Sequence, residues 1–123
     1  MLIRVLVVDP EKTVADAAAM LLEARGYTTR AVYNARDAIM LATDFKPHAL
    51  VSDARLPGKD GIELAAWFAD NMPTCKVVLI SFNPSVRFRA EEAKRRGHIA
   101  AFISKKEDLG ELLSFLSAIC PER

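Results

Sequence analysis

Short apolar runs alternate along the chain with longer segments whose apolar residues recur at helical spacing. The apolar runs are residues 5–8, 49–53, 77–80 and 101–104. Near-continuous runs of this kind are typical of strands that are covered on both faces of a parallel sheet. A further segment, 27–33, carries polar residues at 28, 29 and 30. We expect this segment to form a strand at an edge of the same sheet.

Five segments between and after these runs are predicted to be helices. Gly26, Pro47 and Gly97 mark helix ends, and Asn34 is a favourable N-cap. The fourth helix is expected over about 85–96, and Asp108 with Glu111 makes a capping pair for the last. The predicted inward-facing residues are Val14, Ala17, Ala18, Leu21 and Leu22; Ala38, Leu41, Ala42 and Phe45; Ile62, Ala65, Ala66, Ala69 and Met72; Val86, Ala90 and Ala93; and Leu109, Leu112, Leu113, Leu116 and Cys120.

Five strands alternating with five helices predict a doubly wound α/β domain with a parallel five-stranded sheet and helices on both faces. The flavodoxin-like strand order 2-1-3-4-5 puts the second strand at an edge, as the polar segment 27–33 requires. At 123 residues, we expect residues 1–123 to form a single domain. This fold binds its ligands beyond the carboxyl ends of the strands.

Charge and apolar length exclude several classes of function. The net charge is +1, so we expect no direct nucleic acid binding by this segment. The apolar run nearest the start, 5–8, is too short for a signal peptide or a membrane span, and we expect a cytoplasmic protein that does not contact the membrane. Cys75 and Cys120 have no metal-ligand spacing around them and are expected to be buried.

Four of the predicted strands end in residues that carry chemistry. These residues are Asp9, Asp53, Ser81 and Lys105. Each of them alone is most often a turn or capping residue. Because the carboxyl ends of parallel strands share one edge of the sheet, we expect Asp9 and Asp53 to lie close together at the switch point between the first and third strands.

The stretch after Asp53 continues with Pro57-Gly58 and Asp60-Gly61. With the four strand-end residues, this pattern resembles the receiver domain of two-component response regulators over essentially the whole chain. The resemblance implies that Asp53 accepts a phosphoryl group from a sensor histidine kinase or a histidine phosphotransfer protein in a phosphorelay. It also implies a Mg²⁺ site at Asp9, Asp53 and the backbone carbonyl of Arg55.

The same resemblance assigns the remaining roles. Ser81 and Lys105 would contact the phosphoryl oxygens, and Ser81 and Phe102 would change position after phosphorylation. The change would be read on the face formed by the fourth helix, fifth strand and fifth helix, by an effector protein or a second copy of the chain. Phe88 and Phe115 are candidate interface residues there. Such a domain is regulatory and not an enzyme, with at most slow self-phosphorylation from small donors and slow autodephosphorylation.

Three positions depart from the receiver pattern. Pro10 replaces the second acid of the usual pair, so we expect weak Mg²⁺ binding, with Glu11 as a candidate substitute ligand. A structural alternative is that Pro10 starts the first helix. Phe82 replaces a small residue beside Ser81, and Lys106 replaces a proline, so the Lys105-Lys106 bond is expected to be trans.

These departures leave two main hypotheses. The chain is a phosphoacceptor receiver, or it is a pseudo-receiver of the same fold that binds a protein partner without phosphorylation. A third class, an aspartate-nucleophile phosphatase, requires an acid two residues after Asp53, where this chain has Arg55. Magnesium-dependent labelling of Asp53 separates the first two hypotheses.

Overall fold

The computed structural model describes residues 2–81, 83–104 and 109–119. Predictions about Phe82, Lys105, Lys106, Asp108 and Cys120, and about the side chain of Leu109, lie outside the described part of the chain.

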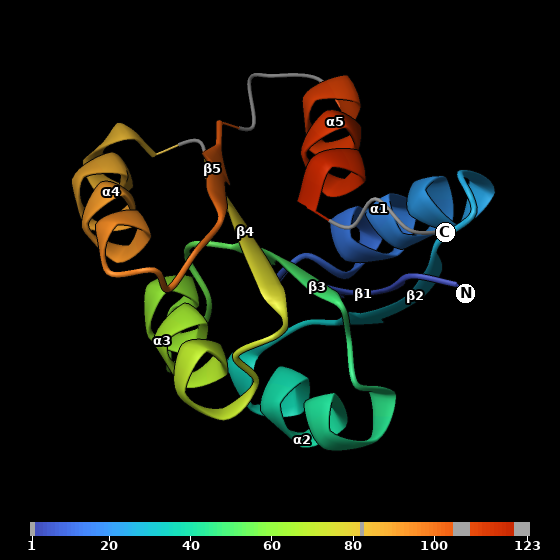
Figure 1. Cartoon of the computed structure of the whole chain (residues 1–123), viewed down its shortest axis with the longest axis horizontal. Helices are drawn as coiled ribbons and strands as arrows, with labels where there is room; N and C mark the ends of the chain where they lie inside the picture. The colour runs from blue at the N-terminus through green and yellow to red at the C-terminus, as the bar shows by residue number, and fades with distance from the viewer. Residues whose placement is uncertain (1, 82, 105–108, 120–123) are drawn as a thin grey trace.

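A parallel five-stranded sheet forms the centre of the molecule, in the order β2-β1-β3-β4-β5 (Figure 1). The strands are β1 (Arg4–Val8), β2 (Thr28–Val32), β3 (Ala49–Asp53), β4 (Lys76–Ile80) and β5 (Ala101–Ile103). The helices are α1 (Lys12–Ala24), α2 (Ala35–Phe45), α3 (Gly61–Asn71), α4 (Arg87–Arg95) and α5 (Leu109–Ile119), with a short 3-10 turn at Pro84–Val86. The predicted fold class, strand order and edge position of the polar strand are confirmed.

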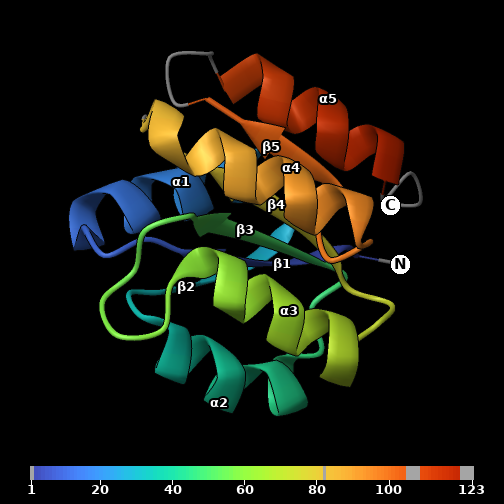
Figure 2. The same cartoon turned by 90° about the vertical axis from the view of Figure 1, so that its left-hand side faces the viewer.

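The helices cover both faces of the sheet, with α1 and α5 on one face and α2, α3 and α4 on the other (Figures 1 and 2). Side chains alternate along each strand, so Val5 and Val7 pack toward α1 and α5 whereas Leu6 and Val8 pack toward the other three helices. Two hydrophobic cores result, one on each face. This explains why the strands read as continuous apolar runs.

The predicted inner face of α1 is wrong in part: Leu22 is buried and Ala18 half-buried as predicted, but Ala17 is exposed. Val14 and Leu21 are 40% and 50% exposed, whereas Ala15, Ala19 and Leu22 are buried. The helix contains two apolar stripes offset by one position, and the periodicity alone does not distinguish them. The buried stripe contains small alanines, which allow the helix backbone to approach the sheet closely.

The other helices follow their predicted faces more closely. Asn34 caps α2 by accepting a hydrogen bond from the backbone N–H of Asp37. In α3 the centre of the buried face is Leu64, Ala65 and Phe68, whereas the predicted residues Ile62, Ala66, Ala69 and Met72 are only half-buried. The predicted inner residues of the fourth helical segment, Val86, Ala90 and Ala93, are buried, although α4 itself begins at Arg87 after the 3-10 turn. Leu112, Leu116 and Cys75 are buried as predicted. No helix in the described ranges is both long and apolar enough to cross a membrane.

Candidate functional site

The strand register places Asp9, Asp53 and Ser81 at one edge of the sheet. Val8 pairs with Ser52 across β1 and β3, so Asp9 follows beside Asp53. Asp53 pairs with Ile80 across β3 and β4, so Ser81 follows on the other side. The phosphoacceptor candidate therefore occupies the central strand of the three, between a second acid and a hydroxyl. Lys105 follows β5 but lies outside the described residues.

Asp9 is held in a turn that contains Pro10. The side chain of Asp9 is 6% exposed, and its Oδ1 accepts a hydrogen bond of 2.9 Å from the backbone N–H of Glu11. This is an Asx-turn, and proline at its centre pre-sets the backbone dihedral that the turn needs. Glu11 is the N-cap of α1, so Pro10 precedes the helix and is not its first residue. The alternative that Pro10 starts the helix is wrong, because the turn delays the helix by two residues.

Asp53 is held in the same manner. Its Oδ1 accepts a hydrogen bond of 2.9 Å from the backbone N–H of Arg55, and the side chain remains half-exposed. The backbone N–H of Ala54 donates to the carbonyl of Ile80, which continues the sheet one residue past the strand. The carboxylate therefore has a fixed orientation at the rim, accessible to a substrate in solvent. The side chain of Arg55 is exposed.

Ser81 is buried beside Asp53, with 4% of its surface exposed. Its Oγ accepts a hydrogen bond of 3.0 Å from the backbone N–H of Asn83. Asn83 in turn accepts a bond from the backbone N–H of Ser85 and so starts the 3-10 turn that leads into α4. A hydroxyl that accepts one bond still carries a proton to donate. Ser81 is thus suited to donate to an oxyanion at Asp53 while connecting that site to α4.

The start of α3 packs directly behind the end of β3, where Asp53 lies. A Cβ placed on Gly61 would lie 2.3 Å from the carbonyl oxygen of Asp53 and 2.7 Å from the Cα of Ala54. The backbone N–H of Gly61 also donates to the carbonyl of Ala54, at 2.9 Å. Only glycine permits this approach. The position of the Asp53 backbone is therefore coupled to the position of α3.

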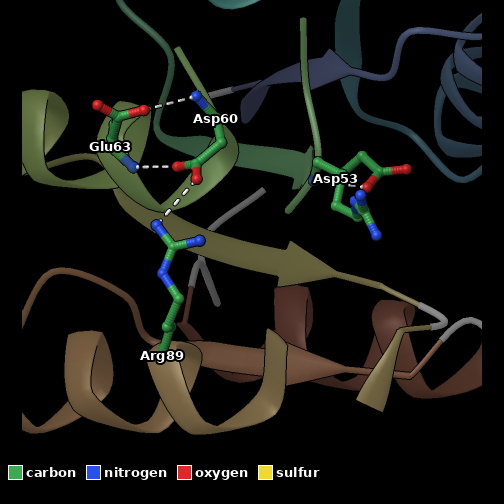
Figure 3. Close-up of polar contacts among 5 residues, drawn as sticks. Asp53, Asp60, Glu63 and Arg89 are labelled. Atoms are coloured by element: carbon green, nitrogen blue, oxygen red, sulfur yellow. Dashed lines mark hydrogen bonds and ion pairs between the residues drawn. The ribbon is translucent and has the colours of Figure 1, made fainter. Parts of the chain in front are cut away.

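Asp60 joins the start of α3 to α4. Its Oδ1 accepts a hydrogen bond from the backbone N–H of Glu63, whose side chain accepts one from the backbone N–H of Asp60, forming a capping box. The other carboxylate oxygen of Asp60 lies 2.9 Å from the guanidinium of Arg89 (Figure 3). Sequence reasoning gave Asp60 and Arg89 no role. The capping box is readable from the Asp60 and Glu63 spacing, but the contact with Arg89 depends on how the two helices pack.

The donor set fits a hard cation incompletely. Carboxylate oxygens of Asp9 and Asp53 and the carbonyl of Arg55 are the ligand types that Mg²⁺ prefers. Glu11 is exposed, and in the described part of the chain no three His, Cys, Asp or Glu side chains gather closely enough to hold a metal ion. The role of Glu11 as a substitute ligand stays a prediction.

Three phenylalanines were predicted to act in switching or in an interface, and they differ in burial and in their neighbours. Phe102 is half-buried, with the guanidinium of Arg87 5.7 Å from its ring centroid. Phe88, a candidate interface residue, is 78% exposed and borders a hollow between α3 and α4 with Ile62. Phe115 packs partly buried against the core on the opposite face of the sheet. That Phe88 and Phe115 belong to one interface stays a prediction.

Comparisons with known proteins agree with this geometry. Residues 5–117 match the family model of the response regulator receiver domain. The polar-differentiation response regulator DivK of Brucella anthropi is 32% identical over 85 residues, which are 69% of each chain. The signal receiver domain of an HD domain-containing protein from Pseudomonas fluorescens has a TM-score of 0.89 at 26% identity, covering 98% of this chain and 96% of that one.

The chemotaxis response regulator CheY4 of Vibrio cholerae shares the fold, with a TM-score of 0.83 at 19% identity over 97% of this chain and 99% of that one. Receiver domains of this family are regulatory parts of two-component signalling that interact with kinases and effectors and bind Mg²⁺ at their phosphorylation site. Both the strand-end acids and the match over nearly the whole length lead to the same assignment: the chain belongs to the response regulator receiver family.

Proposed function

We propose that this domain accepts a phosphoryl group on Asp53 from a sensor histidine kinase or a histidine phosphotransfer protein. The observation that carries the proposal is the location of Asp53 at the carboxyl end of the central strand, between Asp9 and the buried hydroxyl of Ser81. The backbone N–H of Arg55 orients the Asp53 carboxylate. The Asp53 side chain is half-exposed and therefore accessible to a phosphoryl donor.

In the transfer step, a carboxylate oxygen of Asp53 attacks the phosphorus of the donor phosphohistidine. The new P–O bond forms as the P–N bond breaks, and the imidazole nitrogen leaves with the bonding electron pair. The reaction is governed by alignment and charge neutralisation. The Ser81 hydroxyl would donate a hydrogen bond to a phosphoryl oxygen, and Lys105 would supply a positive charge.

Asp9, Asp53 and the Arg55 carbonyl would hold Mg²⁺, which supplies neutralising charge to the phosphoryl oxygens. Pro10 removes one of the acids that receivers usually place here, so we infer weak affinity for the ion. The Asx-turn around Pro10 keeps Asp9 oriented toward the strand edge despite this loss.

We infer that the signal leaves the site through Ser81. Movement of its hydroxyl toward the phosphoryl group would break the bond from Asn83 and shift the turn that precedes α4. Phe102, which contacts Arg87 of α4, would then change its packing. The affected surface is the α4-β5-α5 face, read by an effector or a second copy of the chain.

A pseudo-receiver that binds its partner without phosphorylation is the second candidate function. Pro10 and the lack of a third acid near Asp9 and Asp53 among the described residues favour it. In this case the partner reads the single conformation held by the turns at Asp9, Asp53 and Ser81.

Intact-mass spectrometry after incubation with Mg²⁺ and acetyl phosphate separates the two functions. A phosphoacceptor gains one phosphoryl group, and the gain disappears in Asp53→Asn and without Mg²⁺. A conventional receiver labelled in parallel controls for the donor. If the folded protein gains nothing while the control is labelled, the phosphoacceptor function is rejected and the binding module remains.

A further inference from the structure

A partly open hollow of about 620 Å³ lies at the amino-terminal ends of the strands, whereas Asp53 lies at their carboxyl ends. It borders the first residue of β1 and the segments that lead into β3 and β4, and its lining includes Arg4, Lys46, His48, Trp67 and Asn71. Its volume is within the range of small-molecule sites. Neither the proposed phosphorylation chemistry nor the family assignment uses these residues.

Two permanent cations line this hollow, and within the described ranges no carboxylate does. The Nε of Arg4 donates a hydrogen bond of 2.9 Å to the carbonyl of Lys46, which fixes the guanidinium at the turn between α2 and β3. The backbone N–H of Arg4 donates to Nδ1 of His48 at 2.9 Å, and the N–H of His48 donates to the carbonyl of Arg4 at 2.8 Å. The Arg4 guanidinium is therefore held in place by the backbone of the turn, and Lys46 adds an exposed ammonium group beside it.

Lys46 adopts a backbone conformation that is costly for a lysine. It is the C-cap of α2 with φ of 51°, in the left-handed region, where glycine or asparagine is favoured. It is the one non-glycine residue with positive φ in the described part of the chain. A strained backbone position that keeps a charged side chain indicates a use for that side chain.

The side chains that line this hollow carry net positive charge, which favours a positive electrostatic potential there. Burial and the nearby charge of Arg4 lower the pKa of His48 below its usual range. The carboxyl-terminal ends of α2 and α3 oppose this potential, since each helix end carries roughly half a negative charge. The two full positive charges of Arg4 and Lys46 exceed the summed partial negative charge of the two helix ends. The side-chain amide of Asn71 also donates a hydrogen bond to the carbonyl of Trp67 near the end of α3.

Trp67 gives the hollow an aromatic surface. It is half-buried on α3, where its ring packs edge-on against Phe68 at a centroid distance of 5.2 Å. A planar ligand ring can stack on an indole held in this way, as bases stack on aromatic side chains in proteins that bind single-stranded nucleic acids. Cations and an aromatic side chain in one hollow fit a ligand that is both planar and negatively charged.

We propose that this hollow binds a nucleoside phosphate, with the phosphate groups at Arg4 and Lys46 and the base against Trp67. Arg4 suits this role because its guanidinium forms a planar fork that matches phosphate oxygens. The site lies at the far edge of the sheet from Asp53, so occupation of one site does not block the other.

Trp67 is the single tryptophan of the chain, so its fluorescence reports directly on this hollow. The full chain is titrated with ATP, with inorganic tripolyphosphate and with adenosine, in EDTA so that no metal-dependent binding at Asp53 contributes. We expect a saturable change with ATP, and affinities at least about tenfold weaker for the two fragments, since each keeps only one of the two contacts.

Lys46→Gly is the decisive variant, because glycine is favoured at this backbone position and the fold is kept. We expect it to weaken ATP binding about tenfold. Lys94→Gln, which removes the same charge from the exposed face of α4, and Asp53→Asn should bind ATP as the unaltered chain does. The proposal is overturned if ATP gives no saturable change, if Lys46→Gly binds ATP unchanged, or if tripolyphosphate binds as tightly as ATP.

Discussion

Pro10 stands where the receiver pattern has a second acid, and it lies at the centre of a rigid turn. It pre-sets the Asx-turn in which the Glu11 N–H binds the Asp9 carboxylate, and it keeps a third negative charge away from Asp9 and Asp53. Like charges that share a site disfavour their common ionisation. We propose that proline at this position favours a stable metal-free domain at the expense of Mg²⁺ affinity.

Pro10→Asp is expected to raise the affinity for Mg²⁺ at least about tenfold, since a carboxylate close to a cation contributes several kcal/mol at an intermediate effective dielectric. Without the ion, the same variant should unfold at a lower urea concentration because three acids then repel one another. Calorimetric Mg²⁺ titration and urea unfolding measure both effects. Pro10→Asn, which lacks the charge, is the control, and equal Mg²⁺ affinity in the two variants would contradict the electrostatic account.

His48 makes stability depend on pH. Its Nδ1 accepts the Arg4 N–H, which requires the neutral ring, and burial together with the Arg4 charge lowers its pKa from the ordinary 6.5. The folded state therefore binds fewer protons than the unfolded state as pH falls below about 6.5. The stabilisation is full above that pH and is lost as pH falls through the folded pKa.

Urea unfolding between pH 8 and pH 5 should show this loss in the unaltered chain. In His48→Asn the side-chain oxygen can still accept the Arg4 N–H but does not titrate, so its stability should fall less steeply over the same interval. Parallel pH profiles for the two proteins would rule out the proposed effect of His48.

At the scale of elements, α1 presents two apolar stripes, and the sheet buries the one that contains Ala15, Ala19 and Leu22. Ala15 and Ala19 are in contact with the core, whereas Val14 and Leu21 face solvent. The isolated domain therefore exposes an apolar stripe on α1 that includes Val14 and Leu21.

Two adjacent leucines test this helix orientation. Leu22→Ala should lower the free energy of unfolding by about 2–5 kcal/mol, because it leaves a cavity at a fully buried position. Leu21→Ala, the matched change on the solvent side, should alter it by no more than about 0.5 kcal/mol. Chemical denaturation compares the two, and similar losses would mean that the buried face of α1 lies between the two leucines.

At the scale of the molecule, the contact between Arg89 and Asp60 connects α4 to the helix that supports Asp53. The ion pair is largely exposed, so it contributes at most about 1 kcal/mol to stability. The ion pair matters because of where it lies: it joins α4, which belongs to the proposed output face, to the N-terminus of α3.

Arg89→Gln should increase hydrogen exchange of the α4 amides and of the first turn of α3, because the tether between them is removed. Lys94→Gln takes the same charge from the same helix without touching Asp60 and should leave α3 exchange unchanged. High salt should reduce the difference between Arg89→Gln and the unaltered chain. Equal exchange in both variants would show that the helices are held by packing alone.

The strands, their order and the strand-end positions of Asp9, Asp53 and Ser81 were predictable, because buried parallel strands have a simple apolar signature and a fixed carboxyl edge. The inner face of α1 was not predictable, because two apolar stripes on this helix have the same periodicity. The Arg89 contact with Asp60 and the cationic hollow around Arg4 depend on residues distant in sequence. Their proximity follows from helix packing, which local pattern does not encode.

The close approach of Gly61 to Asp53 has a consequence for how the gene can vary. Every missense change of a glycine codon adds at least one carbon, and at this position that carbon would lie against two backbone atoms that cannot rotate away. Gly58, three residues earlier, has a positive φ but open space around it, so it can become asparagine at modest cost. We therefore expect genetic drift to alter the tip of this loop more readily than Gly61, which packs against the end of β3.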